Sequence, residues 1–265
     1  GSGIGDPNSS NGDVKRAYSE VYGNKLYVGQ QVGFGPNAYT KVSVWNGAFW
    51  THLPVILNTF EVSGFTVNAH GIFVVVEINY DNIDRVYRFH NSAWNLIFQT
   101  TYSYHNRLFT ENGVMYLAGD FVGPNNTSKL AKFNPSTNTF DPMPALPWQI
   151  PRVDDLKYFN GKLYLSGGSG QFILVNSPDF LWRLDNGTSW VKAANHFNLG
   201  QGVNRAKIFT RNNNLYTVNF NSSCIIHKLQ NDTLITIDTL NAGYIKDITE
   251  YKGLTYFAQN GQHQI

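Results

Sequence analysis

One short pattern recurs six times along this chain of 265 residues and constrains the fold more than any other feature. Each copy has a turn pair such as Asn-Gly, then a strand-like run of apolar residues around an aromatic residue, and often a closing glycine. The six aromatic residues stand 40 to 52 positions apart, about 46 on average, and they are Tyr27, Phe73, Tyr116, Tyr164, Tyr216 and Tyr256. A repeat of this length predicts an array of stacked units.

A second element follows each of the first five copies. It reads as a strand, a tight Asn- or Gly-containing turn and another strand that opens with a bulky apolar residue, and the copies begin near Val44, Arg88, Lys132, Trp182 and Lys228. Asn and Gly suit such hairpins because both tolerate positive φ. Each repeat therefore predicts four short antiparallel strands, a to d. Units of this size must stack on one another to bury both faces, as propeller blades do.

We therefore predict an all-β chain with a polar lead-in at 1–13 and a single β-propeller domain at 14–265. The expected blades cover about 14–53, 64–98, 105–143, 153–194, 204–238 and 244–265, the last being partial. A six-bladed propeller is favoured, and a truncated seven-bladed one is the alternative. Because an unpaired second strand would leave an open sheet edge, we expect that the chain either is cut short or is completed by another chain.

Composition excludes several classes of protein. Only 14% of the residues are charged and the formal net charge is +2, whereas neutralising many phosphates requires a basic excess, so nucleic-acid binding is disfavoured. No run of apolar residues is long enough for a membrane-spanning helix. The single cysteine, Cys224, forms no intrachain disulfide and lies in an apolar run that predicts a buried strand position.

The segment Phe140-Asp-Pro-Met-Pro144, followed by Arg152 and by Asn160-Gly-Lys-Leu-Tyr-Leu-Ser-Gly-Gly168, resembles the kelch motif. The pairing of Leu-Tyr-Val-Gly with Val-Trp-Asn-Gly-x-x-Trp is similar to kelch-like arrays of secreted Bacteroidetes proteins and to the central propeller domain of galactose oxidase. This resemblance covers about residues 14–260 and implies a propeller from a bacterial, secreted or surface protein. Only the fourth copy keeps the paired glycines. The resemblance does not imply one activity, because kelch-type propellers include enzymes, lectins and scaffolds.

Signatures of catalysis and metal binding are missing from the sequence. The seven histidines form neither an HxH nor an HExxH spacing, and the chain contains no GxSxG and no phosphate-binding loop. A galactose-oxidase copper site would need a Cys–Tyr crosslink, which Cys224 in an apolar run does not favour. The pairs Asp81/Asp84 and Asp154/Asp155 could act as general acid and base, but we expect solvated strand ends. We predict no catalytic residue, no metal and no cofactor.

Binding residues are expected on the long loops. In a propeller the b–c and d–a loops share one face, and here that face collects six aromatic residues: Phe34, Tyr39, Phe121, Trp148, Phe172 and Phe197. Large loops on a rigid scaffold are a common place for binding. The tryptophans of the c–d hairpins recur at one position, which favours packing between sheets over sugar stacking: Trp45, Trp50, Trp94, Trp182 and Trp190.

These observations predict a non-catalytic module, extracellular or attached to the cell surface. We expect it to mediate protein–protein interaction in a surface or outer-membrane assembly, where the partner could complete the last blade. A glycan-binding lectin that uses the loop aromatics is the alternative. A glycoside hydrolase or oxidase on a propeller scaffold comes third.

Overall fold

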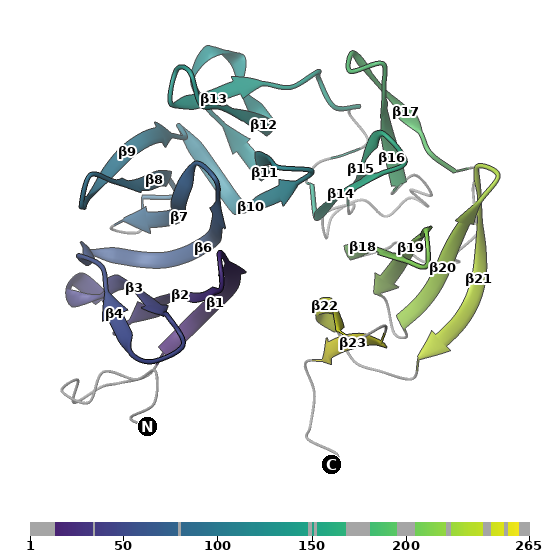
Figure 1. Cartoon of the computed structure of the whole chain (residues 1–265). Coiled ribbons are helices and arrows are strands. Elements are labelled where there is room, and N and C mark those ends of the chain that lie inside the picture. The colour runs from purple at the N-terminus through teal and green to yellow at the C-terminus, as the bar shows by residue number, and fades with distance from the viewer. Residues whose placement is uncertain are drawn as a thin grey trace. The chain divides into compact units, whose positions relative to one another are not determined.

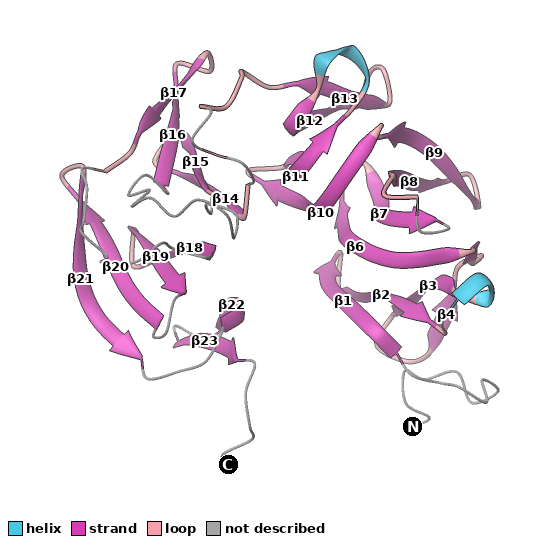
Figure 2. Cartoon of the chain, turned by 180° about the vertical axis from the view of Figure 1, so that it is seen from behind, coloured by secondary structure: helices cyan, strands magenta, loops and turns pink. Residues whose placement is uncertain are grey.

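The computed structural model describes residues 14–33, 35–78, 81–147, 150, 153–167, 181–194, 205–220, 224–240, 245–251 and 254–259. These residues form 23 β-strands and two short 3-10 turns, and no α-helix occurs among them (Figure 2). No helix in the described part is long and apolar enough to cross a membrane. Contacts divide the chain into two compact units, Gly1–Met143 and Pro144–Ile265. The all-β prediction is confirmed, and the single domain over 14–265 stays a prediction.

The first unit contains three antiparallel sheets, each with its strands in chain order (Figure 1). The first sheet has β1 (Val14–Tyr22), β2 (Lys25–Val32), β3 (Tyr39–Trp45) and β4 (Trp50–His52), and the short β5 (Ile56–Leu57) also pairs with β3. The second has β6 (Thr59–Asn68), β7 (Gly71–Ile78), β8 (Asp84–His90) and β9 (Ala93–Gln99). The third has β10 (Tyr102–Glu111), β11 (Val114–Val122), β12 (Ser128–Asn134) and β13 (Thr139–Pro142). The 3-10 turns are η1 (Gly35–Asn37) and η2 (Pro124–Asn126).

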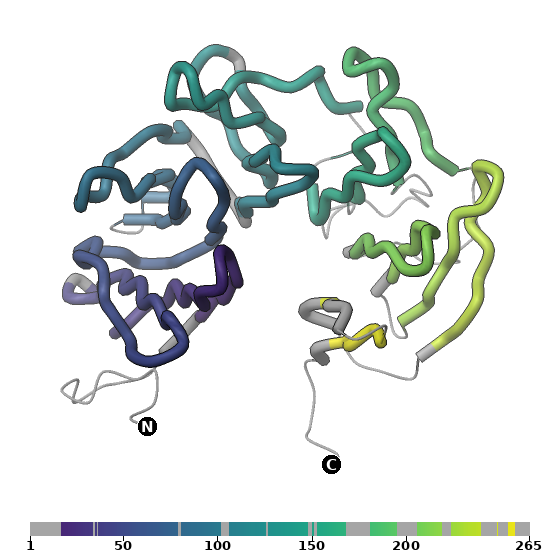
Figure 3. Tube along the Cα trace, in the orientation of Figure 1, coloured from purple at the N-terminus to yellow at the C-terminus, as the bar shows by residue number. Residues whose placement is uncertain are grey.

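The second unit contains the other three sheets, and Figure 3 traces the antiparallel passes of the chain through them. The fourth sheet has β14 (Asp155–Phe159), β15 (Lys162–Ser166), β16 (Leu181–Asp185) and β17 (Ser189–Lys192). The fifth has β18 (Arg205–Arg211), β19 (Asn214–Phe220), β20 (Cys224–Gln230) and β21 (Thr233–Leu240). Among the described residues the sixth sheet has two strands, β22 (Ile245–Tyr251) and β23 (Leu254–Gln259).

The six repeated aromatic residues occupy one equivalent position. Each lies on strand b, and its partner on strand a is the third pair from the a–b turn. The pairs are Tyr27 with Glu20, Phe73 with Thr66, Tyr116 with Phe109, Tyr164 with Lys157, Tyr216 with Phe209 and Tyr256 with Thr249. The sequence repeat is therefore a structural repeat in strict register.

The tight turns owe their shape to asparagine and glycine. In the a–b turn of the third sheet, Asn112 and Gly113 have φ of 50° and 73°, and Asn160 and Gly161 of the fourth sheet have 46° and 76°. Two consecutive residues with positive φ form the type I′ turn, whose twist matches that of antiparallel strands. The high asparagine content thus serves the hairpins, as the sequence predicts.

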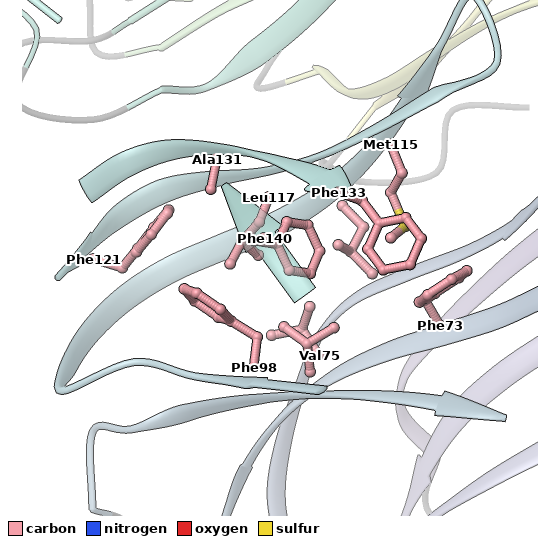
Figure 4. Packing of buried hydrophobic residues seen from close by; sticks show 11 residues of the cluster. Phe73, Val75, Phe98, Met115, Leu117, Phe121, Ala131, Phe133 and Phe140 are labelled. Atoms are coloured by element: carbon pink, nitrogen blue, oxygen red, sulfur yellow. The ribbon is translucent and has the colours of Figure 1, made fainter. Parts of the chain in front are cut away.

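An aromatic core joins the second and third sheets (Figure 4). Phe98 of β9 meets Phe140 of β13 with ring centroids 5.3 Å apart, and Phe133 of β12 meets Phe73 of β7 at 5.2 Å, both edge to face. This geometry places the positive edge of one ring against the negative face of the other. The predicted stacking of one repeat on the next is therefore seen directly in the first unit.

Side-chain hydroxyls also donate hydrogen bonds to backbone oxygens on strand a of the following sheet. In the first unit the Tyr18 hydroxyl donates to the backbone oxygens of Val62 and Ser63, at 3.3 and 3.2 Å. In the second unit the Ser166 hydroxyl donates to the Ala206 oxygen at 2.7 Å. Buried backbone polar groups need such partners. In these two cases a side chain of one sheet hydrogen-bonds to the edge strand of the sheet that follows it.

The observed strands refine two predicted boundaries. The second blade begins five residues before the predicted position 64, because β6 starts at Thr59. The b–c loop of the third sheet, which was expected to carry Phe121, begins later in the chain, because β11 continues to Val122. This second difference moves one proposed binding residue, Phe121, out of the loop and into a strand.

Candidate functional site

The structure describes two of the six aromatic residues predicted to form a binding face. Phe121 is 1% exposed and belongs to the core between the second and third sheets, 6.2 Å from the ring of Phe98, so its prediction as an exposed loop residue is wrong. Tyr39 begins β3, is partly buried and pairs with Leu57 of β5. Four others, Phe34, Trp148, Phe172 and Phe197, lie outside the described residues.

Two hairpin tryptophans hydrogen-bond to the segment that precedes their own sheet in the chain. The indole nitrogen of Trp94 donates to the Pro54 oxygen at 2.6 Å, and that of Trp190 donates to the Pro144 oxygen at 3.1 Å. Both tryptophans stand next to the c–d turn, and both acceptors lie in the segment that follows the d strand of the preceding sheet. A buried indole N–H requires such an acceptor. The packing role predicted for these residues therefore agrees with their contacts.

Three of the four acidic residues, Asp84, Asp154 and Asp155, are buried, so the prediction that they are solvated strand ends is wrong for these three. Asp84 is 4% exposed, and its carboxylate accepts a hydrogen bond from the Asn106 amide at 2.8 Å. Asp155 is 8% exposed, and its Oδ2 accepts the backbone N–H of Ile208 at 2.9 Å. Buried carboxylates need partners of this kind. Asp84 and Asp155 therefore connect one sheet to the next.

Glu20 has the same role in the first unit. Its carboxylate accepts the backbone N–H of Val67 at 2.6 Å and the hydroxyl of Thr66 at 3.2 Å. The Thr66 hydroxyl also lies 2.9 Å from that of Thr110, so the contacts extend over three sheets. Burial raises the pKa of Glu20, although the hydrogen bonds from Val67 and Thr66 counteract this effect.

Arginine side chains link the turn ends of neighbouring sheets. Arg88 lies on β8 opposite Phe73, and its Nη1 donates to Oδ1 of Asn138 in the next c–d turn at 2.7 Å. Arg183 occupies the equivalent place on β16, and its Nη1 donates to Oδ1 of Asp232 at 3.3 Å. Because these pairs are exposed on one side, they help to set the orientation of the turns more than they stabilise the fold.

Burial strongly shifts the pKa of His227. It lies on β20 with no exposed surface, and its Nδ1 is 3.1 Å from the hydroxyl of Thr236. Burial lowers the pKa of His227 to about 4, because the low-dielectric interior disfavours the charged imidazolium. The imidazole is therefore neutral at pH 7. Its position inside a sheet indicates a structural role.

The described residues contain no group of three or more His, Cys, Asp or Glu side chains arranged to hold a metal ion. The Cys224 thiol is buried, as expected from its apolar run.

Exposed apolar residues occur at several places in the described part, and four of them lie on the last strands of the second unit. On β21, Ile235 is 43% exposed and Ile237 is 52% exposed, whereas a packed sheet would cover such side chains. On β23, Leu254 and Tyr256 are 56% and 47% exposed. We call Ile235, Ile237 and the outer edge of β23 the open edge. Exposed apolar surface of this kind marks interaction sites.

Sequence reasoning did not select Ile235 and Ile237, although one signal was present. The fifth c–d hairpin has Leu234 where other copies have a tryptophan or phenylalanine next to the turn. This departure distinguishes the outer strand of the fifth repeat from the outer strands of the other copies.

Comparison with known proteins finds similarity at the level of structure. The β-propeller domain of the Trilobed protease from Pyrococcus furiosus, described as having an open velcro topology, matches with a TM-score of 0.58 and 8% identity over 94% of this chain and 79% of that one. A protein from Lactobacillus plantarum matches with a TM-score of 0.56 and 12% identity over 90% and 76% of the two chains. The fold is a β-propeller.

A third propeller neighbour is Sqt1 from Chaetomium thermophilum, solved bound to the N-terminus of a ribosomal protein. It has a TM-score of 0.50 and 12% identity over 86% of this chain and 64% of that one. No family model matches the sequence. No curated protein matches it either. At these identities the likeness concerns the fold alone, because propellers with very different functions share it.

Proposed function

We propose that this chain is a non-catalytic propeller module that binds a protein partner in an extracellular or cell-surface assembly. The observation that carries the proposal is the open edge, where Ile235 and Ile237 are exposed on β21 and the sixth sheet has two strands among the described residues. Apolar side chains on a strand next to an unpaired edge favour a protein ligand, because another protein can supply both backbone hydrogen bonds and apolar contact.

Two further points support this proposal. The propeller neighbour Sqt1 is bound to the N-terminus of a ribosomal protein, so one protein of this fold holds a protein segment. The kelch-like pattern and its similarity to secreted Bacteroidetes proteins favour a bacterial surface setting. One of the six aromatic residues expected to bind a glycan, Phe121, is buried in the core, which weakens the glycan-binding alternative.

Site-specific crosslinking tests the proposal. A photo-crosslinking amino acid is placed at position 237 of the full chain, and the protein is illuminated with surface fractions of the source cells. The control carries it at position 57, because Leu57 is also an exposed apolar strand residue, 63% accessible, in the other unit. We expect one protein to crosslink from position 237 and not from position 57. Equal patterns from both positions, or carbohydrate as the sole specific ligand on a glycan array, would contradict the proposal.

A further inference from the structure

Two c–d turns of the second unit contain the acceptor motif for N-linked sugars, Asn-x-Ser/Thr with no proline at x. The fourth sheet has Asn186-Gly-Thr188 and the fifth has Asn231-Asp-Thr233. Each acceptor asparagine is the first residue after strand c, with φ of 50° and 49°. The c–d turns of the first three sheets lack the motif, because the asparagines there are followed by Gly-Ala, Ser-Ala, Pro-Ser and Thr-Phe. Among these turns the motif is thus confined to the fourth and fifth sheets.

The turn of the fourth sheet is open to solvent. It is a three-residue loop between the paired residues Asp185 and Ser189, and the backbone N–H of Thr188 donates to the Asp185 oxygen at 3.1 Å. The side chains of Asn186 and Thr188 are both exposed. A methyl group built on Gly187 between them has no heavy atom of the described residues within 4 Å, apart from its chain neighbours. The amide and the hydroxyl that define the motif are therefore accessible together in the folded protein.

Another copy of the motif, Asn125-Asn-Thr127 in the b–c connection of the third sheet, has the opposite environment. Asn125 is exposed, but Thr127 has no exposed surface, and its hydroxyl donates to the Pro124 oxygen at 2.6 Å. A methyl group built on Gly123 would lie 2.5 Å from that hydroxyl oxygen and 2.6 Å from the ring of Phe98. The hydroxyl of this copy is therefore out of reach of an enzyme that acts on the folded chain.

The copy in the fifth sheet has a third environment. Asn231 and Thr233 are exposed, and the Thr233 hydroxyl lies 3.5 Å from the Asn231 backbone oxygen. The middle residue, Asp232, accepts a hydrogen bond from Nη1 of Arg183 at 3.3 Å, so its side chain is held by the neighbouring sheet. The structure therefore favours the copy of the fourth sheet over the other two.

We propose that Asn186 carries an N-linked sugar, a proposal that rests on the extracellular setting proposed above. A glycosyltransferase joins Nδ2 of Asn186 to the anomeric carbon of a sugar activated as a diphosphate ester. The bond between that carbon and the phosphate oxygen breaks, the diphosphate leaves, and Nδ2 gives up one proton to a base of the transferase. An attached sugar is bulky and hydrated. It therefore excludes this turn from any interface, and a protein partner binds the second unit elsewhere.

Mass spectrometry of the full chain, purified from its source cells, tests this proposal. Trypsin releases residues 184–192 as a peptide with a single asparagine, and residues 108–129 as the peptide that contains Asn125. We expect a sugar on Asn186 and none on Asn125, located by a fragmentation method that leaves the sugar attached. Thr188→Ala, produced in the same cells, should lose the sugar completely although Asn186 is still present. The matched variant Thr188→Ser keeps the hydroxyl and should retain the sugar.

Three results would overturn the proposal. An unmodified Asn186 in protein that an added protease digests on intact cells refutes the site but keeps the extracellular setting. An unmodified Asn186 in protein that is protected until the cells are broken refutes the site together with that setting. A sugar that persists in Thr188→Ala, or equal occupancy of Asn125 and Asn186, shows that the exposed hydroxyl does not decide the modification. Crosslinking from position 237 tests the protein-binding role separately, because Asn186 is not part of the open edge.

Discussion

Acidification provides the sharpest test of how the fifth sheet is packed. Burial lowers the pKa of His227 to about 4 from its usual 6.5, so the imidazole is neutral in the folded protein over a range in which it is charged in the unfolded chain. The contribution of the neutral His227 to the free energy of unfolding is complete above pH 6.5 and is lost as the pH falls toward 4. From these two values the loss is about 2 kcal/mol at pH 5 and about 3 kcal/mol at pH 4.

Urea unfolding of the wild type and of His227→Gln at pH 7 and pH 5 measures this effect. Glutamine cannot be protonated, so the variant should lose about 2 kcal/mol less than the wild type between the two pH values. The comparison removes the contribution of Glu20, whose raised pKa acts in the opposite direction and favours the folded state at low pH. His90→Gln is the control, because His90 is exposed. Identical pH dependence in the wild type and His227→Gln would refute the assignment of a buried, neutral imidazole.

Four further substitutions at three positions test individual packing contacts, each by urea unfolding at pH 7. Trp190→Phe removes the donor to the Pro144 oxygen and should cost about 1 to 2 kcal/mol, so an unchanged midpoint would contradict the bond. Asp155→Ala leaves the buried N–H of Ile208 without its acceptor and should cost about 1 to 3 kcal/mol. Asp155→Asn should lose less stability than Asp155→Ala, because an amide oxygen can also accept the N–H of Ile208. Equal losses in the two variants would show that the negative charge of Asp155 matters more than its acceptor oxygen. Gly119→Ala places a methyl group 2.7 Å from backbone of the neighbouring strand and should cost about 1 to 3 kcal/mol, whereas a neutral result would show that β10 and β11 can separate.

The sequence alone determined the repeat and its local structure. The period of about 46 residues, the aromatic anchors and the Asn-Gly turns are local properties, and each is encoded within a few consecutive residues. For this reason the fourth sheet follows the predicted order of strands a to d, as β14, β15, β16 and β17. Hairpin turns depend on the φ preferences of two residues, and these preferences follow directly from the residue types in the sequence.

Tertiary structure decided which side chains are covered. The sequence predicted Phe121 as an exposed aromatic residue of a binding loop and did not select Ile237, yet Phe121 is 1% exposed and Ile237 is 52% exposed. Asp155 looked like a solvated strand end and instead holds the backbone of the next sheet. Burial of a strand residue depends on the sheet stacked against it, which lies some forty residues away in the chain. The sequence therefore defines each sheet, while the contact between one sheet and the next decides which residues remain open to a partner.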